Sequence, residues 1–146
     1  MNIFLIRAVC GAAMAFTTTL ALGAPAPDVT VNMLGVRPGG GMMRAVLCTR
    51  IEQFPTTCRV RSAQAASAGT TAIVFKGVPA GTYAFAAFHD TNSNGRLDMA
   101  GRMPKESLAF SNDAMGSQGV PSFSSSAFKV TGNTQVTVKM RHVGPR

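Results

Sequence analysis

Ten residues near the middle of the chain, His89 to Asp98, have the side chains and the spacing of a calcium-binding loop. Oxygen-bearing side chains recur at alternate positions from Asp90, and Gly95 stands at the sixth position counted from Asp90, where such loops turn most sharply. With Arg96 contributing its backbone carbonyl, the predicted ligands within the loop are Asp90, Asn92, Asn94, Arg96 and Asp98. Because a hard cation takes six to eight oxygen ligands, the spacing predicts a Ca²⁺ site completed from elsewhere.

The closing ligand is missing from its usual place. The twelfth position, where a helical calcium hand has a bidentate glutamate, is Gly101, and the loop follows a predicted strand instead of a helix. These departures exclude an EF-hand. We expect Glu106, or as second candidate Asp113, to close the site together with water, with weak affinity of about 10⁻⁴ to 10⁻³ M. Mg²⁺ is the lesser alternative, and turn-capping by Asp and Asn without any metal is the other.

The charge distribution points to the same segment. Four of the six Asp and Glu residues lie between positions 90 and 113, against three basic residues, so this segment has a net charge of −1. The rest of the chain after residue 24 has ten basic and two acidic residues, a net charge of +8. Clustered carboxylates repel one another unless a cation lies among them, although an acidic solvated loop is an equal interpretation.

Groups that could perform catalysis are few. His89 beside Asp90 would suit a metal-dependent hydrolase that activates a metal-bound water, but a ring packed at a strand end is the preferred interpretation. We expect a structural role for His142 as well. No nucleophile motif such as G-x-S-x-G occurs in the sequence. The sequence therefore favours a protein that is not an enzyme.

The N-terminal segment has the composition of a secretory signal peptide. A single charge, Arg7, precedes an apolar run over residues 8–22 and then small residues at 21–24. The run is shorter than the roughly 20 residues of a membrane-spanning helix. We predict export to the periplasm or the extracellular medium, with residues 1–24 as the signal peptide and residues 25–146 as one domain.

Two cysteines remain after the predicted cleavage, Cys48 and Cys58. In an oxidising compartment, two cysteines of a small exported domain usually pair. A zinc site would need neighbouring Cys or His ligands, which the sequence lacks around these positions. We therefore predict a Cys48–Cys58 disulfide.

Alternation of apolar and polar residues, punctuated by Gly, Pro and Asn, predicts an all-β fold. We expect a single antiparallel β-sandwich of about seven strands, of the immunoglobulin-like kind, with one long loop at 90–125. The segment 104–110 is expected to form a helical turn, and Gly132-Asn133 a hairpin between the last two strands. The predicted strands cover residues 29–33, 43–48, 58–61, 71–76, 83–88, 128–130 and 136–141.

Basic residues at polar positions of several strands form a candidate binding face. An anionic envelope polymer or lipid headgroups would be attracted to such a face, whereas nucleic acid is not expected because the exported chain has one Tyr and no Trp for stacking. A solvated sheet face is the alternative. The residues of this predicted basic face are Arg44, Arg59, Arg61, Lys129, Lys139 and Arg141.

Several short motifs carry a family resemblance, strongest over residues 70–142. They are Gly81-Thr82-Tyr83, His89-Asp90 to Leu97-Asp98, Pro104-Lys105-Glu106, Phe110-Ser111-Asn112 and Pro121-Ser122-Phe123 to Ala127-Phe128. With these motifs the chain resembles the exported bacterial family known as domain of unknown function 2141. The resemblance implies a prealbumin-like or carboxypeptidase-regulatory-like sandwich and no established activity. Serines stand at 124–126, where the family pattern leads us to expect acidic residues, so a ligand role there is in doubt.

The residues together predict an exported, non-catalytic β-sandwich module with a calcium-stabilised loop, acting in the cell envelope as a binding or structural protein. Its ligand and its oligomeric state do not follow from the sequence.

Overall fold

The computed structural model describes residues 23–50, 52–115 and 119–143. Apart from its last two positions, the predicted signal peptide lies outside the described residues. Strands dominate, and the bounds are β1 Val29–Val36, β2 Met42–Thr49, β3 Val60–Ala65, β4 Gly69–Phe75, β5 Gly81–Asp90, β6 Met99–Ala100, β7 Met103–Pro104, β8 Leu108–Phe110, β9 Ala127–Val130 and β10 Thr134–Lys139. One 3₁₀ turn, η1 Ser111–Asp113, and one short helix, α1 Phe123–Ser126, lie between β8 and β9.

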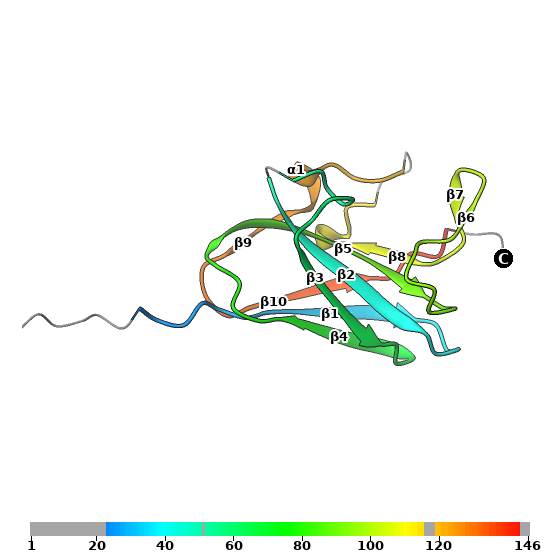
Figure 1. Ribbon diagram of the computed structural model, residues 1–146, viewed down its shortest axis with the longest axis horizontal. Helices are drawn as coiled ribbons and strands as arrows, with labels where there is room; N and C mark the ends of the chain where they lie inside the picture. Colours follow the sequence, from blue (N-terminus) through cyan, green and yellow to red (C-terminus); the bar gives the residue numbers. More distant parts are fainter. Residues whose placement is uncertain (1–22, 51, 116–118, 144–146) are drawn as a thin grey trace, which may run out of the picture.

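Two sheets pack face to face, which confirms the all-β sandwich. One sheet has the order β10-β1-β4, and the other has the order β3-β2-β5-β8, with β9 also pairing with β5. Figure 1 shows β10, β1 and β4 as one layer beneath β2, β3 and β5, with the β6-β7 hairpin projecting beyond them. The loop that leaves β5 therefore starts at the end of a central strand.

The core between the sheets follows from the period of two in the strands. Alternate residues of β1, Val29, Val31 and Met33, are 0% exposed, and Phe85 of β5 meets Phe75 of β4 edge to face with ring centroids 6.3 Å apart. Each side chain of this size contributes roughly 1.5 to 3 kcal/mol by leaving water. The opposite face of β5 also carries apolar residues, and these form a second cluster outside the sandwich core.

Three local predictions were wrong. The segment 104–110 ends in strand β8, which pairs with β5, instead of a helical turn. The last two predicted strands are not a hairpin, because β9 pairs with β5 in one sheet and β10 with β1 in the other. The sandwich was also expected to be antiparallel throughout, but the β1–β10 pair is parallel. β9 and β10 do bury Val130 and Val138 in the common core. Alternation alone does not specify which sheet a strand joins.

The end of the predicted long loop is tied to the sandwich by polar side chains. Ser111 is buried, and its hydroxyl accepts the Phe85 N–H at 2.9 Å and donates to the Ser126 carbonyl. The Asn112 amide donates to the carbonyls of Ser125 at 3.2 Å and Ala127 at 3.0 Å. These bonds join η1 to α1 and β9.

The Cys48–Cys58 disulfide is present, with the two Cα atoms 4.7 Å apart and both residues buried. It closes the segment 49–57 at the end of β2. Among the described residues, no helix has the length and the apolar character needed to cross a bilayer.

Candidate functional site

Asp90, the last residue of β5, anchors the start of the predicted calcium loop. Its buried carboxylate accepts the Arg44 Nε–H at 2.5 Å, the Gly95 N–H at 2.8 Å and the Asn94 N–H at 3.0 Å. Burial alone would raise the pKa of this carboxyl, but the hydrogen bonds from Arg44, Gly95 and Asn94 outweigh burial and hold the pKa below 3.8. Asp90 is therefore ionised at neutral pH and ties the loop to β2.

The Arg44–Asp90 pair is a consequence of the strand register. Met42 of β2 pairs with Asp90 of β5, and Arg44 pairs with Phe88. Arg44 and Asp90 are thus diagonal neighbours on one face of the sheet, within reach of a long side chain.

The exposed rim of the loop brings Asn92, Asn94 and Asp98 together. The Asn92 amide donates to Asp98 Oδ2 at 2.7 Å, and the Asn94 amide donates to Asp98 Oδ1 at 2.9 Å. Hydrogen bonds from Asn94 and Asn92 lower the pKa of Asp98 below 3.8. The amide oxygens of Asn92 and Asn94 accept the backbone N–H groups of Asn94 at 3.1 Å and Arg96 at 2.8 Å.

Glu106 closes the loop through the backbone. The residue is 5% exposed, and its two carboxylate oxygens accept the N–H groups of Thr91 at 3.0 Å and Asp98 at 3.1 Å. Asp113, the second candidate for a closing ligand, instead accepts the Lys139 N–H at 2.8 Å on β10. The structure thus brings Glu106 to the loop and engages Asp113 at a different strand.

Every predicted side-chain ligand in the loop is engaged by protein donors. Asp90 and Glu106 hold backbone N–H groups, Asp98 accepts from the amides of Asn92 and Asn94, and the oxygens of these two amides accept backbone N–H groups. A cation at the exposed rim would have to replace the amide N–H groups at Asp98. Within residues 23–50, 52–115 and 119–143, no group of three or more His, Cys, Asp and Glu side chains is placed to hold a metal. Water would have to complete a Ca²⁺ shell, and the calcium site stays a prediction.

The two histidines lie in structural surroundings. The His89 side chain is 1% exposed, and its Nε2 lies 2.7 Å from the Gly40 carbonyl. Gly41 packs so closely on Asp90 that a Cβ there would overlap the Asp90 carbonyl, so this turn must be glycine. His142 is hydrogen-bonded through Nδ1 to the Ser107 hydroxyl, and burial, with Arg37 nearby, lowers its pKa below 6.5.

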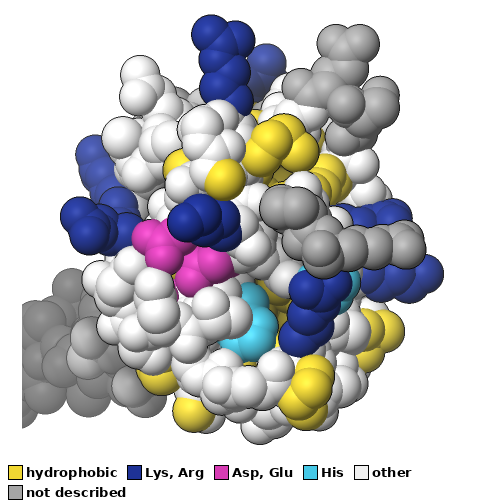
Figure 2. Space-filling view, turned by 90° about the vertical axis from the view of Figure 1, so that its right-hand side faces the viewer, with side chains coloured by type: hydrophobic (Ala, Val, Ile, Leu, Met, Phe, Trp, Pro, Cys, Tyr) yellow, Lys and Arg dark blue, Asp and Glu magenta, His cyan; other side chains and the backbone are white. Residues whose placement is uncertain are grey.

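The predicted basic face is divided between the two sheets. Lys139 lies on β10, whereas Arg44, Arg61 and Lys129 lie on β2, β3 and β9. Arg59 is beside Glu52, with Nε 3.7 Å from Oε1. On the face shown in Figure 2, Lys and Arg side chains are scattered, some at the edge and some beside the Asp, Glu and His side chains, and do not form one patch. Arg44 and Arg61 lie on neighbouring strands, on the same outer face of one sheet.

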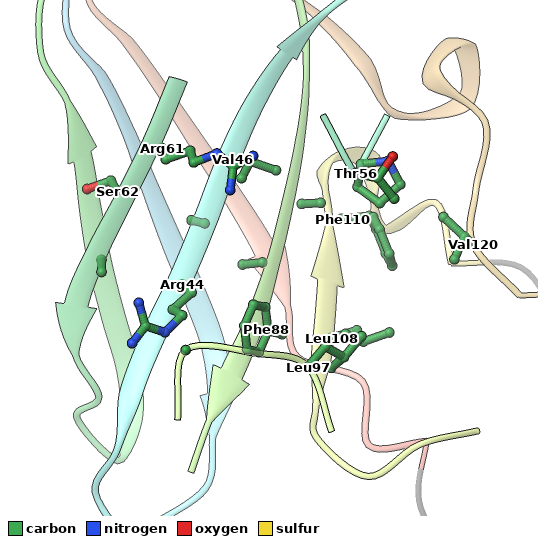
Figure 3. A pocket seen from close by; sticks show the side chains of 16 residues that line it. Arg44, Val46, Thr56, Arg61, Ser62, Phe88, Leu97, Leu108, Phe110 and Val120 are labelled. Atoms are coloured by element: carbon green, nitrogen blue, oxygen red, sulfur yellow. The ribbon is translucent and has the colours of Figure 1, made fainter. Parts of the chain in front are cut away.

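A pocket beside these two arginines was not predicted. It has a volume of about 610 Å³ and lies on the outer face of β2, β5 and β8, where Val46, Ala86, Phe88, Leu108 and Phe110 form its floor. Figure 3 shows Arg44 and Arg61 on one side of this floor and Leu108 and Phe110 on the other. The sequence feature that could have indicated this pocket is the apolar character of both faces of β5.

A protein-family model described as "Uncharacterized protein conserved in bacteria (DUF2141)" matches residues 30–139. The chain belongs to this family. The match confirms the resemblance drawn from the motifs between residues 81 and 128. No curated protein and no solved structure matches the chain.

Within this member of the family, the motif residues have structural roles in the described contacts. Asp90 and Glu106 hold the loop, and Ser111 and Asn112 hold the segment that follows. The serine that follows Phe123 lies in α1, whose N-cap Ser122 accepts the Ser125 N–H at 3.2 Å. The loop rim and the pocket are therefore the two candidate binding surfaces.

Proposed function

We propose that the protein is an exported, non-catalytic binding module of the cell envelope, in which Ca²⁺ stabilises the loop at 90–98. The loop walls one end of the pocket through Gly95 and Leu97. In this proposal the ion fixes a wall of a binding site and takes no part in a reaction. The buried ring of His89 supports the non-catalytic assignment because it gives a metal-bound water no base.

The observation that carries the proposal is the convergence of Asn92 and Asn94 on Asp98. Side chains separated by up to six positions meet at 2.7 and 2.9 Å around one carboxylate at the exposed rim. Asp90 accepts hydrogen bonds from the N–H groups of Asn94 and Gly95. These bonds turn the chain so that the alternate side chains face one another. The contacts with Asp98 are made by the amide N–H groups, so on binding of a cation the Asn92 and Asn94 amides would turn their oxygens toward the ion beside Asp98. The few carboxylates imply an affinity of about 10⁻⁴ to 10⁻³ M.

Thermal unfolding with and without Ca²⁺ tests the proposal. At 10 mM Ca²⁺ and a dissociation constant of about 1 mM, the ion would stabilise the folded protein by roughly 1.4 kcal/mol, which raises Tm by roughly 4 to 8 °C. Asp98→Asn should abolish the increase. Asp28→Asn is the matched control, because Asp28 pairs with Lys76 at 2.7 Å at the start of β1 and is remote from the loop.

The increase in Tm should survive in Asp28→Asn and should not occur with Mg²⁺ at the same concentration. If Ca²⁺ leaves Tm of the unsubstituted protein unchanged, or stabilises Asp98→Asn equally, the calcium proposal is wrong.

A further inference from the structure

Cross-strand register gives the pocket two sides of different character. Along one row, Arg61 of β3, Val46 of β2, Ala86 of β5 and Phe110 of β8 pair in succession. All four residues line the pocket. An arginine therefore stands at one end of an apolar row that finishes in an aromatic ring.

The neighbouring row is divided in a similar way, with its arginine one strand further in, on β2. Ala63, Arg44, Phe88 and Leu108 pair in succession across the same four strands and also line the pocket. Positive charge lies on the β3 and β2 side in both rows, and the apolar surface lies on the β5 and β8 side, as Figure 3 shows.

Two loops wall the ends of the floor. Pro55 and Thr56 belong to the segment closed by the disulfide, and Gly95 and Leu97 belong to the predicted calcium loop. These loops follow opposite ends of the antiparallel pair β2–β5, since Thr49 pairs with Tyr83 and Met42 with Asp90. The volume of about 610 Å³ lies within the range of small-molecule sites.

The charges at the pocket do not cancel. Arg44 is neutralised by Asp90 at 2.5 Å. Arg61 donates its Nε–H to the Cys58 carbonyl at 3.0 Å and, within residues 23–50, 52–115 and 119–143, has no ion pair. One net positive charge beside an apolar floor is complementary to a ligand with one negative charge and an apolar body.

We infer that this pocket binds a single-chain amphiphile with one carboxylate, such as a medium-chain or long-chain fatty acid. The carboxylate would accept hydrogen bonds from the terminal amino groups of Arg61, which are free to form a two-pronged contact. The chain would lie over Ala86 and Phe88 toward Leu108 and Phe110. At roughly 30 Å³ for each non-hydrogen atom, the pocket has room for about twenty such atoms. The inference deepens the binding role proposed above and does not require Ca²⁺.

Other ligand classes match the two-sided pocket less well. A neutral apolar molecule would leave Arg61 without a partner, and a free inorganic anion would leave the apolar floor unused. A polysaccharide chain would place hydroxyl groups against Val46 and Phe110, where they would lose hydrogen bonds to water.

Isothermal titration of the purified protein with dodecanoate, below its micelle concentration, tests the inference. We expect saturable binding of one molecule, and weaker binding of shorter carboxylates, by up to about fourfold for each methylene removed. Arg61→Gln should weaken dodecanoate binding by about tenfold or more. Arg59→Gln is the matched control two residues away, because the Arg59 side chain is 85% exposed and is not part of the pocket; it should bind like the unsubstituted protein.

Three probes separate the alternatives. Dodecyltrimethylammonium carries the same chain with the opposite charge and should bind at least tenfold more weakly. Inorganic phosphate should not bind measurably, and vesicles of anionic phospholipid should not retain the protein. Equal affinity for the cationic amphiphile, unchanged affinity in Arg61→Gln when its Tm is intact, retention on vesicles without dodecanoate binding, or no binding at all would each overturn the inference.

Titration in the presence of a chelator distinguishes this inference from the calcium proposal. Dodecanoate binding that persists without Ca²⁺ supports the pocket even if Ca²⁺ proves not to bind the loop. Ca²⁺ stabilisation without dodecanoate binding would leave the calcium proposal standing and remove this one.

Discussion

The two loops that wall the pocket are closed by different means. The segment after β2 is closed by the Cys48–Cys58 disulfide, and Glu52 additionally accepts the N–H groups of Thr49 at 2.7 Å and Arg59 at 2.9 Å. The loop after β5 has no covalent closure and depends on two carboxylates, Asp90 and Glu106.

The difference gives the physical reason why a cation is proposed for the second loop and not for the first. A disulfide limits the unfolded chain permanently, whereas hydrogen bonds to a carboxylate hold only while the carboxylate stays ionised and both partners stay in place. Residues 91–96 are the exposed part of the second loop, and Asp98 beside them is half-buried. An ion there would stabilise the one wall of the pocket that lacks a covalent bond.

Removing Asp90 should have the largest effect on stability. Asp90→Ala leaves the Arg44 guanidinium without its partner and the N–H groups of Asn94 and Gly95 without an acceptor. We expect a loss of about 3 kcal/mol, the lower end of the range for a broken buried pair because the Arg44 side chain is 34% exposed. Chemical denaturation measures this loss, and a loss below about 1 kcal/mol would contradict the anchoring role of Asp90.

Opening the disulfide should have the next largest effect. For the sequence separation of 10 between Cys48 and Cys58, the chain-entropy model predicts a loss of roughly 2 to 3 kcal/mol. The double variant Cys48→Ala with Cys58→Ala should therefore unfold at lower denaturant concentration. Ca²⁺ should still stabilise this variant as much as it stabilises the unsubstituted protein. A loss of the Ca²⁺ effect would show that the two loops are coupled, contrary to the comparison.

The smallest of the three predicted effects is the loss of stability in acid that Glu52 causes in the disulfide-closed segment. The Thr49 N–H, with that of Arg59, lowers the Glu52 pKa below 4.5 in the folded protein, although burial opposes the shift. The stabilisation by Glu52 is thus fully present above pH 4.5 and is lost as the pH falls through the lowered folded pKa. Glu52→Gln should flatten the dependence of unfolding free energy on pH below 4.5. If the dependence of unfolding free energy on pH is unchanged in this variant, ionisation of Glu52 does not stabilise the segment.

The sequence predicted the sandwich and the disulfide because both depend on local patterns and compartment. Period-two alternation is visible in β1, β2 and β10, and a pair of cysteines in a small domain that is predicted to be exported usually forms a disulfide. Residues far away in the sequence decide which sheet a strand joins, which is why β9 and β10 were mistaken for a hairpin. The three residues of β8 are too few to show any period.

The candidate site was predicted in part. The spacing of Asn92, Asn94 and Asp98 identified the loop, and the structure does bring these side chains together. The Arg44–Asp90 pair and the pocket depend on the register of β2 against β5, which the residues of neither strand reveal alone. Glu106 was expected near the loop, but its carboxylate holds backbone N–H groups, a role that spacing does not distinguish from metal ligation.

Hydrogen exchange of backbone amides, measured with Ca²⁺ and with a chelator, tests the calcium-stabilised loop most directly. Ca²⁺ should slow exchange in residues 91–98 and leave residues 52–58, behind the disulfide, unchanged. Equal exchange with and without Ca²⁺ in residues 91–98, or equal slowing in both loops, would contradict the account.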